Sequence, residues 1–543
     1  MSFILAWNRR EVLAAGGSVA ALASLAGIAH AADGPILTTN YGMLRGTRDG
    51  ALCVFKGVRY AAPPLGQLRF KPPHRPRAWS GIADATRFGA PAVQMPDGVA
   101  RNPPRTDLAK ALEGVFPIAE EFRKGREDCL FLNVWTPGIA DGKRRPIMVW
   151  FHGGGFAYGS GAWPMYDGAN LARKGDVVVV TLNHRLNAFG YLELAQIFGS
   201  EYAASGNVGM LDLVAALEWV RDHAAAIGGD GGNITIFGES GGGAKVSYLM
   251  AMPAAQGLFH KAIIESGPGL DALPLTSASD DARALLAELK VSEPGQLQAL
   301  PAPQIINAAY AIMARKPGQF GMNFLEPVVD ERVLPAQPFD PAAPTLSAAV
   351  PLIIGTNKDE MTLFMAGQPW FGKLSEAEFE TRARQQLGAR APAVIAALKL
   401  TFPDYSPSYL ATALATATFM WGNSIKLAER KAAQKAPVFM YQLTFETPVG
   451  KGVLKTPHAL EIPFVFDTVE RARALVGPGP DPQRLANQMS AAWLAFAHSG
   501  EPNATAIPYW PPYDVKARTT MLFNTDSHVV DDPYPLLRKA VLA

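Results

Sequence analysis

The chain has 543 residues, of which 48% are hydrophobic and 18% are charged, and its formal net charge is +2. This composition is that of an ordinary globular protein with enough apolar side chains for a large core. The charge is nearly balanced and contains no basic block, so nucleic acid is not an expected partner.

The first 31 residues have the pattern of a secretory signal peptide. Arg9 and Arg10 precede a short run of small and apolar residues, and Ala29-His30-Ala31 then provides an A-x-A cleavage site. Paired arginines are typical of a twin-arginine signal. A membrane anchor is the alternative, but the run is short and rich in alanine and glycine. We therefore expect residues 1–31 to be removed and residues 32–543 to form a bacterial periplasmic or secreted domain without a stable membrane span.

The chain contains two cysteines, Cys53 and Cys129. An exported protein can form a disulfide, but two cysteines in so large a domain do not make a disulfide scaffold. Neither lies in a cluster of cysteine and histidine residues, so a metal site is not expected. We expect both to be buried thiols.

Apolar runs typical of buried strands alternate with helical patterns through the middle of the chain. The runs cover residues 146–151, 177–182, 234–237, 261–265, 351–354 and 438–443, and helical patterns cover residues 212–225 and 243–252. This alternation predicts an α/β fold, with a mostly parallel sheet and helices on both faces. Two stretches near residues 273–344 and 374–435 interrupt it, and we expect both to be insertions over the active edge of the sheet.

The first motif after a strand is His152-Gly153-Gly154-Gly155. A loop of this HGGG type supplies backbone N–H groups to an oxyanion, and its glycines let the backbone approach the substrate closely. A phosphate-binding loop is the alternative, but neither a Lys-Ser/Thr pair nor a helix follows directly. We expect an oxyanion hole completed by the amide that follows the nucleophile.

The second motif is Gly238-Glu239-Ser240-Gly241-Gly242, between a β-branched run and a helical pattern. Gly-x-Ser-x-Gly in this setting is typical of a nucleophile elbow, which exposes a serine hydroxyl at the end of a strand. Ser240 then needs a histidine oriented by a carboxylate. Glu239 could tune the charge of that histidine or the entry of water, or its carboxyl could simply be satisfied by local hydrogen bonds.

The acid and the base should follow Ser240 in that order along the chain. After the run at 351–354, Asp359 and Glu360 are both possible by position, and each could instead stabilise a helix N-terminus. Four histidines follow the serine, at positions 260, 458, 498 and 528. The first leaves no acid-bearing strand before it, the third ends a helix, and the fourth lies in the C-terminal tail. His458, after the last clear strand, is the expected base.

These motifs resemble the type-B carboxylesterases of the α/β-hydrolase fold, a family that includes para-nitrobenzyl esterases and cholinesterases. Similar blocks occur at residues 54–61, 127–134, 183–190, 206–212, 355–360 and 458–464. The resemblance selects Glu360 over Asp359 as the acid and implies Gly154, Gly155 and Gly241 as oxyanion donors. It implies a serine carboxylesterase that hydrolyses small-molecule esters through an acyl-enzyme and needs no cofactor.

Three features bear on how far the resemblance extends. Cholinesterases have a choline-binding tryptophan ahead of the block at 127–134, but residues 95–110 contain none, so choline esters are not expected. In the family, the cysteine equivalent to Cys129 commonly forms a disulfide with a cysteine about thirty residues earlier, but residues 93–95 contain no cysteine. We expect Glu127 to pair with Arg69 in a structural role.

The substrate remains open at this stage. An apolar pocket could be lined by Phe156, Tyr158, Met361, Phe364, Met365, Trp370, Phe371, Met420 and Trp421, although each such residue is more often part of an ordinary core. Amides and lactones share the triad chemistry and stay as alternatives. A binding protein on the same fold is disfavoured because the serine, acid, histidine and glycine loop are all retained. Composition does not determine the oligomeric state.

Overall fold

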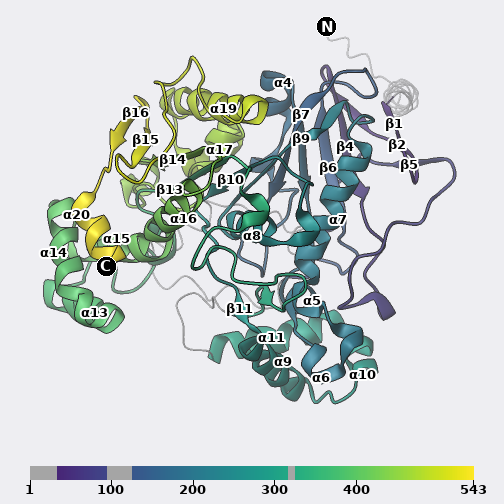
Figure 1. Cartoon of the computed structure of the whole chain (residues 1–543), viewed down its shortest axis with the longest axis horizontal. Helices are drawn as coiled ribbons and strands as arrows, with labels where there is room; N and C mark the ends of the chain where they lie inside the picture. Colours follow the sequence, from purple (N-terminus) through teal and green to yellow (C-terminus); the bar gives the residue numbers. More distant parts are fainter. Residues whose placement is uncertain (1–33, 95–124, 316–323) are drawn as a thin grey trace, which may run out of the picture.

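The computed structural model describes residues 34–94, 125–315 and 324–543 (Figure 1). The predicted signal peptide and the segment 95–110, which lacks tryptophan, lie outside the described residues. Within the described ranges, no helix combines the length and apolarity needed to cross a membrane.

An 11-stranded sheet forms the centre of the molecule. Its strands, in spatial order, are β16 (His528–Asp531), β15 (Thr519–Phe523), β14 (Val438–Leu443), β13 (Leu352–Asn357), β10 (Lys261–Glu265), β9 (Gly229–Glu239), β7 (Arg145–Phe151), β8 (Val178–Leu182), β6 (Phe131–Thr136), β4 (Leu52–Arg59) and β3 (Thr47–Asp49). Neighbours from β8 through β15 are parallel, and the pairs outside this run are antiparallel. The predicted mostly parallel sheet is confirmed, and each predicted apolar run lies on one of its strands.

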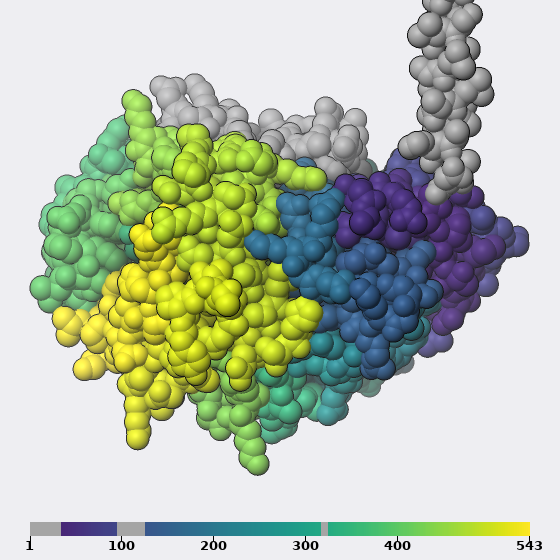
Figure 2. Space-filling view, turned by 90° about the horizontal axis from the view of Figure 1, so that it is seen from above, coloured from purple at the N-terminus to yellow at the C-terminus, as the bar shows by residue number. Residues whose placement is uncertain are grey.

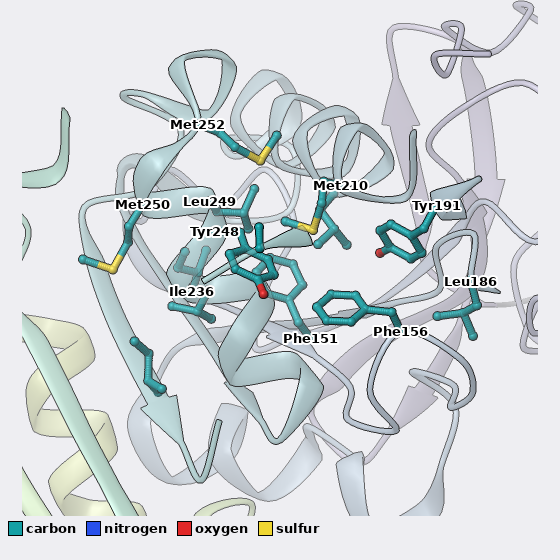
Figure 3. Close-up of a cluster of buried hydrophobic side chains, with 14 of the residues drawn as sticks. Phe151, Phe156, Leu186, Tyr191, Met210, Ile236, Tyr248, Leu249, Met250 and Met252 are labelled. Carbon is teal, nitrogen blue, oxygen red and sulfur yellow. The ribbon is translucent and has the colours of Figure 1, made fainter. Parts of the chain in front are cut away.

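Alternating side chains of the strands pack into two apolar cores on opposite faces of the sheet. Val149 and Phe151 of β7 belong to one core, whereas Met148 and Trp150 belong to the other. This is the two-residue period expected of a strand buried on both sides. The first core, part of which is drawn in Figure 3, is covered by α7 (Val208–His223), α8 (Gly241–Ala251) and α16 (Gly422–Ala432). The second is covered by α4 (Ala169–Gly175), α17 (Ile462–Val465) and α19 (Asp481–Ser499).

Two groups of helices lie beside the sheet (Figure 1). One contains α5 (Asn187–Tyr191), α6 (Ala195–Phe198), α9 (Leu275–Leu289), α10 (Pro294–Ala299) and α11 (Ala302–Arg315). The other contains α13 (Glu376–Leu387), α14 (Ala391–Thr401), α15 (Pro407–Ala415) and the C-terminal α20 (Pro535–Leu542). From above, the early segments and the late segments occupy opposite ends of the molecule (Figure 2).

Two small sheets, one of three strands and one of two, complete the architecture. A three-stranded sheet contains β1 (Ile36–Thr39), β2 (Gly42–Arg45) and β5 (Ile82–Asp84), and a second pair joins β11 (Leu273–Pro274) to β12 (Val328–Val329). Cys53 and Cys129 are both buried and free, as predicted. The predicted pair of Arg69 and Glu127 is also confirmed, with Nε of the arginine 2.7 Å from Oε2 of the glutamate.

Candidate active site

Ser240 lies in a sharp turn between β9 and α8, with φ of 57° and ψ of −124°. A residue with a side chain rarely adopts this conformation, and such strain is concentrated at functional sites. Neighbouring glycines make the turn possible, because a Cβ on Gly242 would lie 2.0 Å from the Phe151 carbonyl oxygen. The Ser240 N–H donates a 2.8 Å hydrogen bond to the carbonyl oxygen of Glu265 on the adjacent β10. The backbone therefore has the strand–turn–helix geometry predicted for a nucleophile elbow.

The two neighbouring carboxylates after β13 have different partners. Oε2 of Glu360 accepts a 2.6 Å hydrogen bond from Nδ1 of His458, and its Oε1 accepts the Asn357 N–H at 2.7 Å. Asp359 instead accepts a 2.6 Å hydrogen bond from the hydroxyl of Tyr405. Both carboxylates are buried. The structure thus pairs His458 with Glu360, the residue that the family resemblance selects.

The other three candidate histidines lie in different surroundings. Nδ1 of His260 accepts the Ile234 N–H at 3.1 Å. His498, in the last turn of α19, forms a 2.8 Å hydrogen bond between its Nε2 and the carbonyl oxygen of Gly175. His528 is exposed on the edge strand β16. Each therefore has a local environment that does not involve the elbow.

Glu239, the residue before the nucleophile, faces the same histidine from the other side of the ring. Its Oε1 lies 3.1 Å from Nε2 of His458, and both side chains are almost fully buried. These two atoms lack the alignment of a hydrogen bond, so they form a close charge contact. Glu239 is therefore near enough to influence the charge of the imidazole, one of the two roles left open by the sequence.

Burial and neighbouring charges shift the proton affinities in this cluster. Burial lowers the pKa of the His458 imidazole, but the carboxylates of Glu239 and Glu360 outweigh that effect and raise it to about 10. Burial also raises the pKa of the Glu239 carboxyl to about 8, against the opposing effect of His458. Glu239 and His458 therefore titrate as a pair, and the charge of each depends on whether the other holds a proton. An ionised Glu239 raises the pKa of His458, whereas a protonated Glu239 does not favour the imidazolium.

The glycine loop after β7 packs against the elbow. A Cβ on Gly153 would lie 3.3 Å from Cβ of Ser240, and one on Gly241 would lie 2.3 Å from the carbonyl oxygen of Gly155. Gly154 and Gly155 have φ of 88° and 60°, in the region that favours glycine. Among the described residues, the N–H groups of Gly154, Gly155 and Gly241 donate to no protein acceptor. These three donors are therefore free to bind a ligand oxygen.

A second buried polar network lies behind the histidine. Glu461 accepts a 2.9 Å hydrogen bond from the Ser266 hydroxyl and a 2.5 Å hydrogen bond from Nδ2 of Asn357. Burial raises the pKa of the Glu461 carboxyl to about 7, and the Glu360 charge adds to this effect. The sequence interpretation had assigned no role to these side chains. The sequence did contain a signal for two of them, because Ser266 and Asn357 are polar residues that closely follow the buried runs at 261–265 and 351–354.

The candidate pocket residues are divided between the site and the core. The half-buried ring of Phe364 lies 5.2 Å from the His458 ring, centroid to centroid. Tyr158 is exposed, whereas Phe156 and Trp421 are buried in the first core. The ring of Phe364 is thus packed against the histidine.

Comparisons with known proteins identify the family of the chain. Residues 33–536 match the carboxylesterase family. The chain is 36% identical to the para-nitrobenzyl esterase of Bacillus subtilis strain 168, over 92% of this chain and 96% of that protein. It is 32% identical to the fumonisin B1 esterase of Sphingopyxis macrogoltabida, over 94% and 91%.

Solved structures give the same result at the level of the fold. A carboxylesterase of Geobacillus stearothermophilus superposes with a TM-score of 0.79 at 38% identity, covering 93% of this chain and 99% of that one. A PNB esterase structure gives a TM-score of 0.79 at 32% identity, covering 94% of this chain and 99% of that one. The predicted α/β-hydrolase fold and carboxylic ester hydrolase activity are confirmed, and the chain belongs to the carboxylesterase family.

Proposed function

We propose that this ester hydrolase acts through an acyl-enzyme formed on Ser240. His458 takes the hydroxyl proton through Nε2 while the serine oxygen attacks the ester carbonyl. Glu360 holds the imidazole by its Nδ1 hydrogen and stabilises the imidazolium that forms. The N–H groups of Gly154, Gly155 and Gly241 stabilise the negative charge on the former carbonyl oxygen.

The remaining steps follow from the same side chains. The tetrahedral intermediate collapses, the bond to the alkoxide oxygen breaks, and His458 gives its proton to the leaving alcohol. A water molecule then attacks the acyl-enzyme with His458 again acting as the base, and the carboxylic acid leaves from Ser240. No oxidant, metal or cofactor is required for these atoms and protons to balance.

The hydrogen bond of 2.6 Å between His458 Nδ1 and Glu360 Oε2 is the observation that carries this proposal. It fixes the tautomer in which Nε2 is left to accept a proton. Nε2 in turn lies 3.1 Å from Oε1 of the residue just before Ser240, which supports a base directed toward the elbow.

The Ser240→Ala variant tests the proposal. We expect loss of nearly all hydrolysis of a p-nitrophenyl ester, by about 10⁶-fold as for other serine hydrolases, with an unchanged melting temperature. A folded variant that retains most of the turnover would overturn the assignment. The matched p-nitroanilide and a lactone, assayed with the wild-type enzyme, measure how far the activity extends beyond esters.

We also propose export and domain boundaries on sequence grounds. The paired Arg9 and Arg10 and the Ala29-His30-Ala31 site support a twin-arginine signal over residues 1–31. Residues 32–543 are then the hydrolase domain, with insertions near residues 273–344 and 374–435. Replacing both arginines by lysine should block export of the full chain while leaving the esterase active in the cell lysate. Periplasmic activity that survives the double substitution would contradict this signal.

A further inference from the structure

Lys245 is a fully buried lysine in the first turns of α8, five residues after the nucleophile. Its Nζ donates a 2.8 Å hydrogen bond to the carbonyl oxygen of Gly155 and a 3.1 Å hydrogen bond to that of His152. These two carbonyls lie at opposite ends of the glycine loop. The ammonium group therefore ties both ends of this loop to the helix that begins at Ser240.

The surroundings of Lys245 are apolar and disfavour a charged amine. Its Nζ lies 5.0 Å from the centre of the Phe156 ring, which packs against the rings of Tyr191 and Tyr248 (Figure 3). Burial lowers the pKa of Lys245 to about 7, and Glu239 opposes the shift. His152 and His184 also face this amine, and burial together with the Lys245 charge lowers the pKa of His152 to about 3. Because burial removes the amine from solvent, the two carbonyl oxygens are the partners that satisfy its N–H groups.

The backbone geometry shows what the Lys245 hydrogen bonds hold in place. All four carbonyl oxygens from His152 to Gly155 are engaged by protein donors. The first and last accept from Lys245, that of Gly153 accepts from Nδ1 of neutral His152 at 2.8 Å, and that of Gly154 accepts two backbone N–H groups at 3.2 and 3.3 Å. In a trans peptide the C=O of one residue points opposite to the N–H of the next. The Gly154 N–H is therefore set by the Gly153 carbonyl and the Gly155 N–H by the Gly154 carbonyl. Lys245 holds the two flanking peptides and so fixes the ends between which these two N–H groups lie.

We infer that Lys245 is a positioning residue that fixes both ends of the glycine loop against α8, and through them the place of the Gly154 and Gly155 N–H groups relative to the oxyanion formed at Ser240. It contacts no reacting atom. The inference rests on the proposed acyl transfer, and it predicts a loss of transition-state stabilisation rather than of substrate binding when the amine is removed.

The chain contains a matched control for this role. Lys431 of α16 is also fully buried, and its Nζ donates to the carbonyl oxygens of Ser347 at 2.9 Å and Ala348 at 3.1 Å. Burial lowers its pKa to about 8. It performs the same structural task on residues 347–348, which lie at the end of a turn that packs on α8 and are not part of the glycine loop. Replacing either lysine by methionine removes the same chemistry and keeps most of the side-chain volume.

The test compares Lys245→Met and Lys431→Met with the wild-type enzyme. For Lys245→Met we expect kcat on a p-nitrophenyl ester to fall about 10- to 100-fold, less than for a lost donor, with KM nearly unchanged. Affinity for a trifluoromethyl ketone, which mimics the tetrahedral oxyanion, should fall by a similar factor. Lys431→Met should lower the melting temperature but leave kcat near the wild-type value. The inference fails if both variants lose kcat equally, or if Lys245→Met loses kcat without losing affinity for the ketone.

A second variant guards against loss of folding. Lys245→Ala removes three carbons and the amine nitrogen, so added n-propylamine should raise its kcat saturably and leave Lys431→Ala unaffected. The ratio of rates with and without amine is compared at one enzyme concentration. No increase would overturn the inference. Failure of the proposed function itself is distinct, because it would appear as ester hydrolysis that persists in Ser240→Ala.

Discussion

Asp359 and Glu360 are chain neighbours whose side chains lie in separate hydrogen-bond networks. Residue type alone left both as possible partners of the histidine, because each follows the same strand. The structure separates them through contacts made by distant residues, namely Tyr405 to Asp359 and His458 to Glu360. Such contacts depend on how loops 46 and 98 residues away in sequence return to β13, and a local pattern contains no information about them.

The two carboxylates therefore give a matched pair of variants. Glu360→Gln removes the charge that stabilises the imidazolium and allows the wrong tautomer, so we expect kcat to fall by about 10³–10⁴-fold. Asp359→Asn keeps an acceptor for Tyr405 and should change kcat little. Steady-state kinetics on one ester measures both. Equal losses in the two variants would contradict the assignment of Glu360.

The contact between Glu239 and His458 predicts a change in the pH profile. The Glu239 carboxylate raises the pKa of His458, so its removal makes the imidazole easier to deprotonate. The acidic limb of kcat/KM in Glu239→Gln should accordingly move to lower pH. A limb that stays in place, or that moves to higher pH, would show that this charge does not act on the base.

At the scale of elements, the elbow depends on how closely α8 approaches β7. The sequence predicted the strand, the turn and the helix from periodicity and glycine spacing, and it placed the helix at 243–252 where the structure has Gly241–Ala251. The glycine motif also predicted the loop. The sequence interpretation treated Lys245 only as part of the helix, because the partners of its Nζ are carbonyls 90 and 93 residues earlier.

The close approach gives a stability prediction. A Cβ on Gly242 would lie 2.0 Å from a backbone oxygen that cannot move freely, so Gly242→Ala should lower the free energy of unfolding by more than about 2 kcal/mol. Gly295, in α10, has open space around its Cα. Gly295→Ala should be neutral or stabilising by up to about 1 kcal/mol. Urea titrations of the two variants would contradict this account if Gly242→Ala were as stable as Gly295→Ala.

Over the whole molecule, the alternation of apolar runs was sufficient to predict the sheet and its two covered faces. That pattern is local, and it repeats along the chain. The carboxyls buried together at the site were less predictable, because Glu239, Glu265, Glu360 and Glu461 come from different strands and loops. Each is an ordinary surface residue type, and only the assembled sheet places them side by side.

This buried charge gives the fold a pH dependence. Burial raises the pKa of Glu265 well above its ordinary value of 4.5, so the folded protein retains a proton that the unfolded chain releases. The Glu265 contribution to stability is therefore complete below about pH 4.5 and is lost as the pH rises. Glu265→Gln avoids this loss, and its stability advantage should grow by up to about 1.4 kcal/mol per pH unit. A melting-temperature difference that stays constant from about pH 5 to pH 9 would contradict this linkage.

Mass spectrometry of the acyl-enzyme tests the central claim most directly. The wild-type protein, mixed with a p-nitrophenyl ester and quenched in acid within the first turnovers, should gain the mass of one acyl group. Peptide mapping should place that group on Ser240, in the segment that joins β9 to α8. An ester hydrolysed at full rate without any acyl adduct, or with the adduct on another residue, would contradict the mechanism.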